Sequence, residues 1–160
     1  MKLQEHHSDS FGITNGTRQG SVLSPALFAV YLDDLLQRLR ELGVGCHVGG
    51  WWFGAVCYAD DLLLLAPART AAVMMLECCE EFALEHNLQF STDPSPAKSK
   101  SKCIFFCCKQ IRMRKPDNLV LLGEQLPWVA SADHLGHVLH QSGTMDQDAL
   151  VKRDRFILKL

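Results

Sequence analysis

The sequence predicts an α+β fold in which an antiparallel sheet carries helices on one of its faces, in a split βαβ order. Short apolar runs lie on both sides of Asp60-Asp61, over residues 56–66, which is typical of a buried β-hairpin with acids at its turn. Two longer segments, 25–43 and about 70–86, repeat apolar residues at helical spacing. Amphipathic helices that alternate with short apolar strands are the pattern of this class.

Composition is that of an ordinary globular chain. The 160 residues suffice for one domain with a real core, and 48% hydrophobic against 21% charged residues exclude a disordered chain. The formal net charge of -2 gives no basic surplus, so any nucleic-acid binding must come from local patches. Seven cysteines, an odd number with two adjacent pairs, are interpreted as reduced core residues.

No apolar run reaches the ~20 residues that a membrane helix requires. The polar start, Met1 to His7, also lacks the apolar core of a signal peptide. The sequence therefore predicts an intracellular protein that is neither secreted nor membrane-bound.

The first predicted elements are a short strand at 11–13, a glycine-rich loop at 15–20 and a helix. Ser24 is expected to cap this helix, because Ser is favoured at the cap and Pro25 at the first helical position. The helical pattern stops at Gly43.

A second acidic pair, Asp33-Asp34, lies within this helix. The helical period places both acids on the polar side, with Asp34 one turn before Arg38. We interpret this pair as structural.

Residues 43–54 are rich in glycine and aromatic residues, and a strand is expected near 46–48. Trp51 and Trp52 are adjacent, so an extended chain would direct them to opposite faces. One of them could stack on a base, although packing near the hairpin is the commoner role of such a residue.

The acidic hairpin itself has two interpretations. Asp60 and Asp61 are either ordinary turn residues, since Asp tolerates left-handed backbone, or ligands of a divalent metal ion. A buried carboxylate without a partner is costly, so acids at the tip of an apolar hairpin need a cation or open water.

The rest of the chain alternates strands, turns and helix. Lys98, Lys100 and Lys102 form a dense positive patch. The expected elements are a helix from about Thr70 to His86 ending at Asn87, a brief strand at 88–90, a turn-rich stretch at 91–101, a buried strand at 103–107, a hairpin over 119–129, a strand at 134–140 and a helix that begins near 145.

In this order the motifs resemble a reverse transcriptase, more narrowly the palm of a non-LTR retrotransposon polymerase. Two motifs carry the resemblance: Arg18-Gln19-Gly20 followed by Ser24-Pro25, and Tyr-Ala-Asp-Asp over residues 58–61. The resemblance covers about residues 11–140 and implies an α+β, palm-like and ferredoxin-like fold. It divides the chain into a partial palm over 1–140 and the start of a thumb-like helical region over 141–160.

The resemblance implies RNA-templated DNA synthesis, with an RNA template, a DNA primer, deoxynucleotide triphosphates and Mg²⁺ or Mn²⁺. It makes Asp60 and Asp61 the catalytic and metal-binding residues of a two-metal site. It places Tyr58 and Ala59 at the primer end and the 119–129 hairpin at the primer grip. The implied nucleotide-binding residues are Arg18, Gln19 and Gly20 in the loop, and Lys100 or Lys102 near the triphosphate.

One departure affects what we expect of the chain alone. Reverse transcriptases have another metal-binding aspartate on a strand well upstream of the loop, and Asp9 lies too close to the loop and lacks an apolar strand around it. We therefore expect a palm fragment, truncated at both ends, that binds Mg²⁺ weakly and does not extend a primer without the missing upstream segment.

Two alternatives remain open. One is a non-catalytic scaffold or nucleic-acid-binding remnant of a palm. The other is a zinc-binding module, but the spacing contains no Cys-x-x-Cys pair. Its candidate ligands would be Cys103, Cys107, Cys108, His134, His137 and His140.

Overall fold

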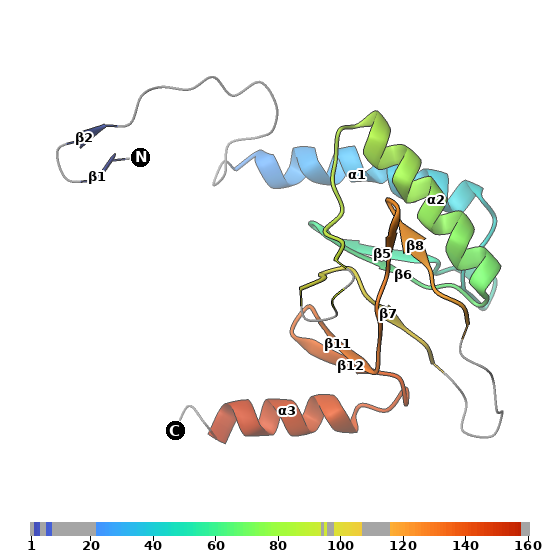
Figure 1. The fold of residues 1–160 in the computed structure, drawn as a ribbon, viewed down its shortest axis with the longest axis vertical. Helices are drawn as coiled ribbons and strands as arrows, with labels where there is room; N and C mark the ends of the chain where they lie inside the picture. The colour runs from blue at the N-terminus through green and yellow to red at the C-terminus, as the bar shows by residue number, and fades with distance from the viewer. Residues whose placement is uncertain are drawn as a thin grey trace.

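The computed structural model describes residues 2–3, 6–7, 22–93, 95, 98–106 and 116–157 (Figure 1). Its helices are α1 (Ser24–Glu41), α2 (Arg69–Glu85) and α3 (Asp146–Ile157). Its strands are β1 (Lys2–Leu3), β2 (His6–His7), β3 (His47–Val48), β4 (Trp51–Trp52), β5 (Ala55–Tyr58), β6 (Asp61–Leu64), β7 (Cys103–Ile104), β8 (Val120–Leu121), β9 (Glu124–Gln125), β10 (Trp128–Val129), β11 (Ser131–His134) and β12 (His137–His140).

The predicted α+β class and the antiparallel acidic hairpin are confirmed. The described strands pair two by two, and five of these pairs, β1–β2, β3–β4, β5–β6, β8–β9 and β11–β12, are antiparallel neighbours in the chain. The remaining pair, β7–β10, is parallel and joins segments far apart in sequence. The sheet component is therefore built mainly from local hairpins, with one long-range pairing.

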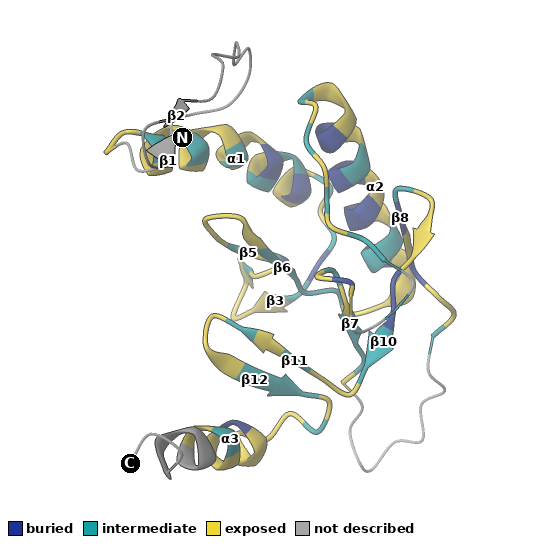
Figure 2. Cartoon of the chain, turned by 60° about the vertical axis from the view of Figure 1, so that its left-hand side comes forward, coloured by how far each residue is buried: buried dark blue, intermediate teal, exposed yellow. Residues whose placement is uncertain are grey.

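The main core lies where α1 and α2 cross above the β5–β6 hairpin (Figures 1 and 2). Its fully buried side chains are Leu35 and Leu39 of α1 with Met75, Cys79 and Phe82 of α2. Ala55, Leu62 and Leu64 of the hairpin pack against this cluster. Burial of each large apolar side chain contributes about 1.5–3 kcal/mol, so this cluster fixes the hairpin beneath the helices.

A second, smaller core joins α2 to the β8–β9 hairpin. Its buried members are Leu76, Leu119, Leu121 and Leu126. The turn of this hairpin has positive φ at Leu122 and Gly123, 53° and 79°. The predicted 119–129 hairpin is thus confirmed for its first part, whereas Trp128–Val129 pairs with β7 instead.

Helix ends follow the sequence with one exception. Gly43, at φ +67°, ends α1, and Asn87, at φ 54°, follows α2, as their left-handed tolerance predicts. The expected Ser24 cap is wrong: α1 already includes Ser24, its N-cap residue is Leu23, and no side-chain capping bond forms there. The helical bond from Leu27 N–H to Leu23 O, at 3.0 Å, accounts for the earlier start.

Several strand predictions need correction. Residues 88–90 are not a strand, and the strand expected at 103–107 is limited to β7 among the described residues. The stretch expected as one strand over 134–140 is part of the β11–β12 hairpin, because Leu135 and Gly136 adopt φ of 49° and 78° and reverse the chain. The strand expected at 11–13 and the loop at 15–20 lie outside the described residues.

The helix expected after 145 is confirmed as α3, and Asp148 attaches it to β12. This buried carboxylate accepts bonds from Lys152 Nζ at 2.9 Å and from the Val138 N–H at 2.9 Å. These bonds, that of Lys152 first, hold the pKa of Asp148 well below its usual range. The division into a palm over 1–140 and a thumb-like region over 141–160 stays a prediction.

No helix among the described residues is both long enough and apolar enough to cross a lipid bilayer.

Candidate active site at the acidic hairpin

The β5–β6 hairpin closes through a two-residue turn, Ala59-Asp60. Its register pairs Tyr58 with Asp61 and Cys57 with Leu62. Ala59 has φ of 51°, the sign that type II′ hairpin turns require at their first central position. An alanine in this region is held at a cost of roughly 1 kcal/mol, because its Cβ approaches the following carbonyl oxygen. Asp60 is therefore a turn residue, and Asp61 is the first residue of β6.

The two faces of this hairpin differ. One face packs toward the helices through Ala55, Cys57, Leu62 and Leu64. The other face is left open, and its side chains, by alternation along the strands, are Val56, Tyr58, Asp61 and Leu63. Tyr58 is 67% exposed, although it is a large aromatic residue. Tyr58 and Asp61 thus lie directly across from each other on a surface that faces away from the core.

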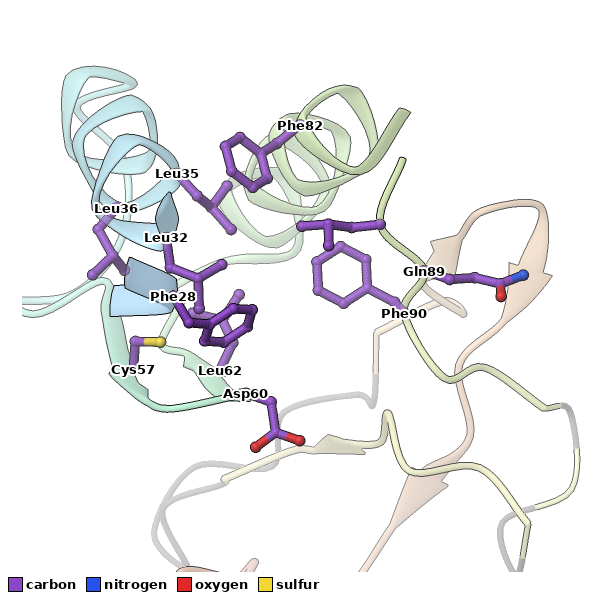
Figure 3. A pocket seen from close by; sticks show the side chains of 11 residues that line it. Phe28, Leu32, Leu35, Leu36, Cys57, Asp60, Leu62, Phe82, Gln89 and Phe90 are labelled. Carbon is purple, nitrogen blue, oxygen red and sulfur yellow. The ribbon is translucent and has the colours of Figure 1, made fainter. Parts of the chain in front are cut away.

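Asp60 lies at the mouth of an apolar pocket of about 120 Å³ between α1, the hairpin and residues 88–90. In Figure 3 the Asp60 carboxylate points away from Phe28 and Leu62, out of the pocket. The lining is otherwise almost entirely apolar and includes Phe28, Leu32, Leu62, Phe82 and Phe90. The pocket therefore supports the turn from beneath and leaves the carboxylate accessible.

Among the described residues, no cationic side chain lies beside the two carboxylates. Neither Asp60 nor Asp61 makes a hydrogen bond or an ion pair with another described residue, and both are exposed. Cys57 lies close to both carboxylates, and its Sγ donates a hydrogen bond to Ala59 O at 3.4 Å. Burial and, after it, the charges of Asp60 and Asp61 raise the pKa of the Cys57 thiol. Unbalanced negative charge at an exposed tip, offered by hard oxygen atoms, suits a divalent cation such as Mg²⁺.

The acidic pair of α1 is different, as the sequence predicted. Asp34 pairs with Arg38 at 2.9 Å, and Asp33 accepts a bond from Gln37 at 2.9 Å. Arg38 also reaches Glu85 of α2 at 2.7 Å. The predicted Asp34–Arg38 pair is confirmed, and these carboxylates have partners within the fold.

Lys100 and Lys102 are exposed and lie on the segment before β7. The turn that carries them is organised by Ser99, which is buried, donates to Ser101 O at 2.6 Å and accepts from the Asp93 N–H at 3.3 Å. No described contact joins either lysine to Asp60 or Asp61, so the structure places the lysines and the acidic hairpin on separate elements. Their expected contact with a triphosphate stays a prediction.

The remaining candidate residues, Arg18, Gln19 and Gly20, lie outside the described residues. Cys107 and Cys108 of the alternative zinc module do so as well. Within the described parts of the chain, no group of three His, Cys, Asp or Glu side chains is placed to hold a metal ion. The structure thus brings together Tyr58, Ala59, Asp60 and Asp61 from the predicted set.

Sequence reasoning missed the residues that support the hairpin. Phe28 and Phe90 line the pocket under Asp60, from α1 and from the segment after α2. Phe28 is one of the apolar residues of the segment predicted as a helix over 25–43, but no local pattern indicates that it lies beneath the acidic turn. Cys57 could have been found, since the period of a strand places it on the face of Leu62 and next to the turn.

The chain is similar in sequence to several known proteins. Residues 2–139 match the family described as reverse transcriptase (RNA-dependent DNA polymerase). A putative 115 kDa protein in the type-1 retrotransposable element R1DM of Drosophila melanogaster is 29% identical over 124 residues, which cover 78% of this chain and 11% of that protein.

Two further relatives are retrovirus-related Pol polyproteins. That of the type-1 element R2 of Nasonia vitripennis is 40% identical over 74 residues, 46% of this chain and 7% of the relative. That of the type-2 element R2DM of Drosophila melanogaster is 34% identical over 86 residues, 54% of this chain and 8% of the relative. The matched parts therefore span about a tenth of the length of these curated relatives.

The family match covers most of the chain and includes the hairpin that carries Asp60 and Asp61. The relatives come from non-LTR retrotransposable elements, as the motifs predicted. The chain belongs to the reverse transcriptase family, the RNA-directed DNA polymerases, and is similar to the enzymes of non-LTR retrotransposons.

Proposed function

We propose that this chain forms the part of an RNA-directed DNA polymerase that carries the acidic hairpin of its catalytic site. One observation carries the proposal. Asp60 and Asp61 are neighbours at an exposed hairpin tip, and no cation or hydrogen-bond donor among the described residues contacts their carboxylates. Holding two like charges side by side gains nothing for the fold. The adjacent charges can serve a function if a bound cation neutralises them.

The ligand chemistry supports Mg²⁺, with Mn²⁺ as a substitute. Both ions prefer carboxylate oxygens, and Mg²⁺ sites commonly combine one or two carboxylates with substrate phosphates and water. Asp60 and Asp61 would hold such ions, and a pair of bound ions would supply the two-metal chemistry of polymerases, in which charge on the attacking primer hydroxyl and on the leaving pyrophosphate is neutralised. Asp60 and Asp61 supply two carboxylates, so further oxygen ligands must come from the nucleotide and from residues beyond the described set.

The other proposed roles come from the resemblance to the family. Tyr58, exposed across from Asp61, would contact the primer end, and Ala59 in the turn would let the primer approach the backbone closely. Arg18, Gln19 and Gly20 would contact the incoming nucleotide and template. Lys100 or Lys102 would reach the triphosphate, and the β8–β9 hairpin would hold the primer. The partners are thus an RNA template, a DNA primer and deoxynucleotide triphosphates.

The test is primer extension on an RNA template with Mg²⁺ present, in a longer polypeptide that joins this chain to the upstream palm segment of a related element. Asp60→Asn removes a ligand charge and hardly changes size, so extension should fall by at least about a hundredfold. Asp33→Asn is the matched control, since it makes the same change in the other acidic pair, and it should do little. Equal losses from both variants, or no loss from Asp60→Asn, would overturn the proposed site.

A non-catalytic scaffold is the competing proposal. It predicts nucleic-acid binding that survives Asp60→Asn and falls steeply with salt, because exposed lysines such as Lys98, Lys100 and Lys102 would contact phosphates. Binding of this kind with no template-dependent extension under either metal would favour the scaffold over the polymerase.

A further inference from the structure

The β3–β4 hairpin lies immediately before the acidic hairpin in the chain and shows an unusual distribution of aromatic side chains. It turns at Gly49-Gly50, with φ of 56° and 83°, as type I′ turns require. The register pairs His47 with Trp52 and Val48 with Trp51. The ladder extends one step further, where the Phe53 N–H donates to Cys46 O at 2.7 Å.

The two adjacent tryptophans have opposite environments. Trp52 packs against the main core, and its Nε1–H donates to Val44 O at 2.6 Å. A Cβ at Gly54 would lie 2.5 Å from the Trp52 ring, so the chain keeps a glycine where that ring passes. Trp51, in contrast, is 73% exposed. Trp52 therefore has the packing role near the hairpin that the sequence analysis considered. Trp51 does not pack against the core.

Phe53 joins Trp51 on the outer face. Alternation along the extended ladder places Trp51 and Phe53 on one side and Trp52 on the other. The exposures agree, since Phe53 is 47% exposed. We call Trp51 and Phe53 the aromatic platform. Two exposed aromatic rings two residues apart form a surface with π-faces available to a partner.

The platform is attached to the acidic hairpin through backbone hydrogen bonds. Cys46 N–H donates to Leu65 O at 2.9 Å, and Leu65 N–H donates to Gly54 O at 2.7 Å, so the two hairpins share a common base. Figure 2 shows β3 beside the β5–β6 hairpin. Trp51 and Tyr58 are seven positions apart in the chain, so the backbone between them spans at most about 25 Å. A single nucleic-acid strand at the acidic hairpin would be within reach of the platform.

We propose that the aromatic platform stacks on unpaired bases of a single-stranded nucleic acid that passes the acidic hairpin. The inference rests on the proposed function, which brings nucleic acid to that hairpin. Side chains two residues apart in a strand are about 6.8 Å apart, twice the rise of about 3.4 Å per stacked nucleotide. The platform therefore fits bases that are unstacked from each other, and it selects a single strand over a duplex. Stacking on aromatic rings is tolerant of sequence, because every base has a π-face.

The test is fluorescence anisotropy of labelled oligothymidylate and oligouridylate of equal length, without metal or nucleotides, on the 160-residue chain. Trp51→Ala and Phe53→Ala should each weaken binding at least about fivefold, the lower end for loss of one stacked base. Trp51→Phe should retain most of the affinity. Leu84→Ala is the control, since Leu84 is as exposed as Trp51 but lies on α2. Affinities for the two oligonucleotides decide whether the strand is DNA or RNA.

Binding should also quench tryptophan fluorescence in the unchanged chain, and Trp51→Phe should remove most of the quenching while binding persists. Circular dichroism of each variant confirms that the fold is kept. Unchanged affinity in Trp51→Ala and Phe53→Ala would overturn the platform, as would equal affinity for a duplex. A change in self-association without a change in oligonucleotide affinity would make the surface a protein contact and would also overturn it. None of these outcomes depends on Asp60, so the proposed catalytic site would stand or fall separately in the extension assay.

Discussion

The chain contains the dipeptide Asp-Asp twice, and the structure treats the two copies differently. In α1, Asp34 pairs with Arg38 at 2.9 Å and Asp33 accepts a bond from Gln37 at 2.9 Å, four residues on in both cases. In the β5–β6 hairpin, Asp60 and Asp61 lie at an exposed tip and make no such bond with a described residue. A helix supplies partners one turn away, whereas a hairpin tip projects beyond its neighbours. The same dipeptide therefore has side-chain partners within the fold at one site and is left available to a ligand at the other.

The surroundings of the two acidic pairs also differ, because one pair lies beside the core and the other at an open surface. The helix pair belongs to a layer whose inner face carries the buried Leu35 and Leu39, while the hairpin tip has an open face that carries Tyr58. Stability should therefore depend on the helix layer, and ligand binding on the hairpin tip. The following substitutions test that division, from the largest expected effect to the smallest.

The largest contrast is between two aromatic residues. Phe82→Ala empties a fully buried position in α2 and should lower the free energy of unfolding by about 3–5 kcal/mol. Tyr58→Ala removes an exposed ring and should change it by no more than about 0.5 kcal/mol. Urea denaturation followed by circular dichroism measures both. A loss of several kcal/mol from Tyr58→Ala would mean that the hairpin tip is part of the core.

The same substitution should have opposite effects in the two regions. Ala29→Gly, at an exposed position of α1, should lower the free energy of unfolding by about 1 kcal/mol, because glycine is a poor helix former. Ala59→Gly should be neutral or stabilising by up to about 1 kcal/mol, because Ala59 has φ of 51°. Thermal and urea unfolding of both variants decide the point. If Ala59→Gly destabilised as much as Ala29→Gly, the strain at the turn would be absent.

The smallest effect concerns the charges themselves. Asp34→Asn should lower the midpoint of thermal unfolding slightly, because Arg38 then loses one of its two carboxylate partners, Asp34 and Glu85. Asp60→Asn should leave the midpoint unchanged or raise it, because it removes repulsion between adjacent carboxylates. Differential scanning calorimetry at low salt resolves shifts of this size. A larger loss from Asp60→Asn than from Asp34→Asn would reverse the comparison.

The features that were predicted correctly depend on residues close together in the sequence. The Asp34–Arg38 pair and the extent of α1 were predictable because each depends on residues four positions apart. The acidic hairpin was predictable because two short apolar runs flank the acidic pair directly, so its strands are neighbours in the chain. The family resemblance added the expected roles, which neither periodicity nor spacing contains.

The failures have physical causes of two kinds. Parallel pairing of β7 with β10 depends on residues far apart in sequence, which local patterns do not report. Leu135 adopts φ of 49°, a conformation that leucine rarely takes, so the β11–β12 turn was read as continuous strand. The pocket under Asp60 was missed for the first reason, since its lining residues Phe28 and Phe90 are far apart in sequence.

The central claim is that the hairpin pair, and not the helix pair, is available to a divalent cation. The most direct measurement is Mn²⁺ binding to the 160-residue chain, followed by the electron paramagnetic resonance signal of free Mn²⁺, because it requires no catalytic activity. The account predicts weak binding that is lost in the double variant Asp60→Asn, Asp61→Asn and retained in Asp33→Asn, Asp34→Asn. Binding that is unaffected by the hairpin variant, or lost only in the helix variant, would contradict it.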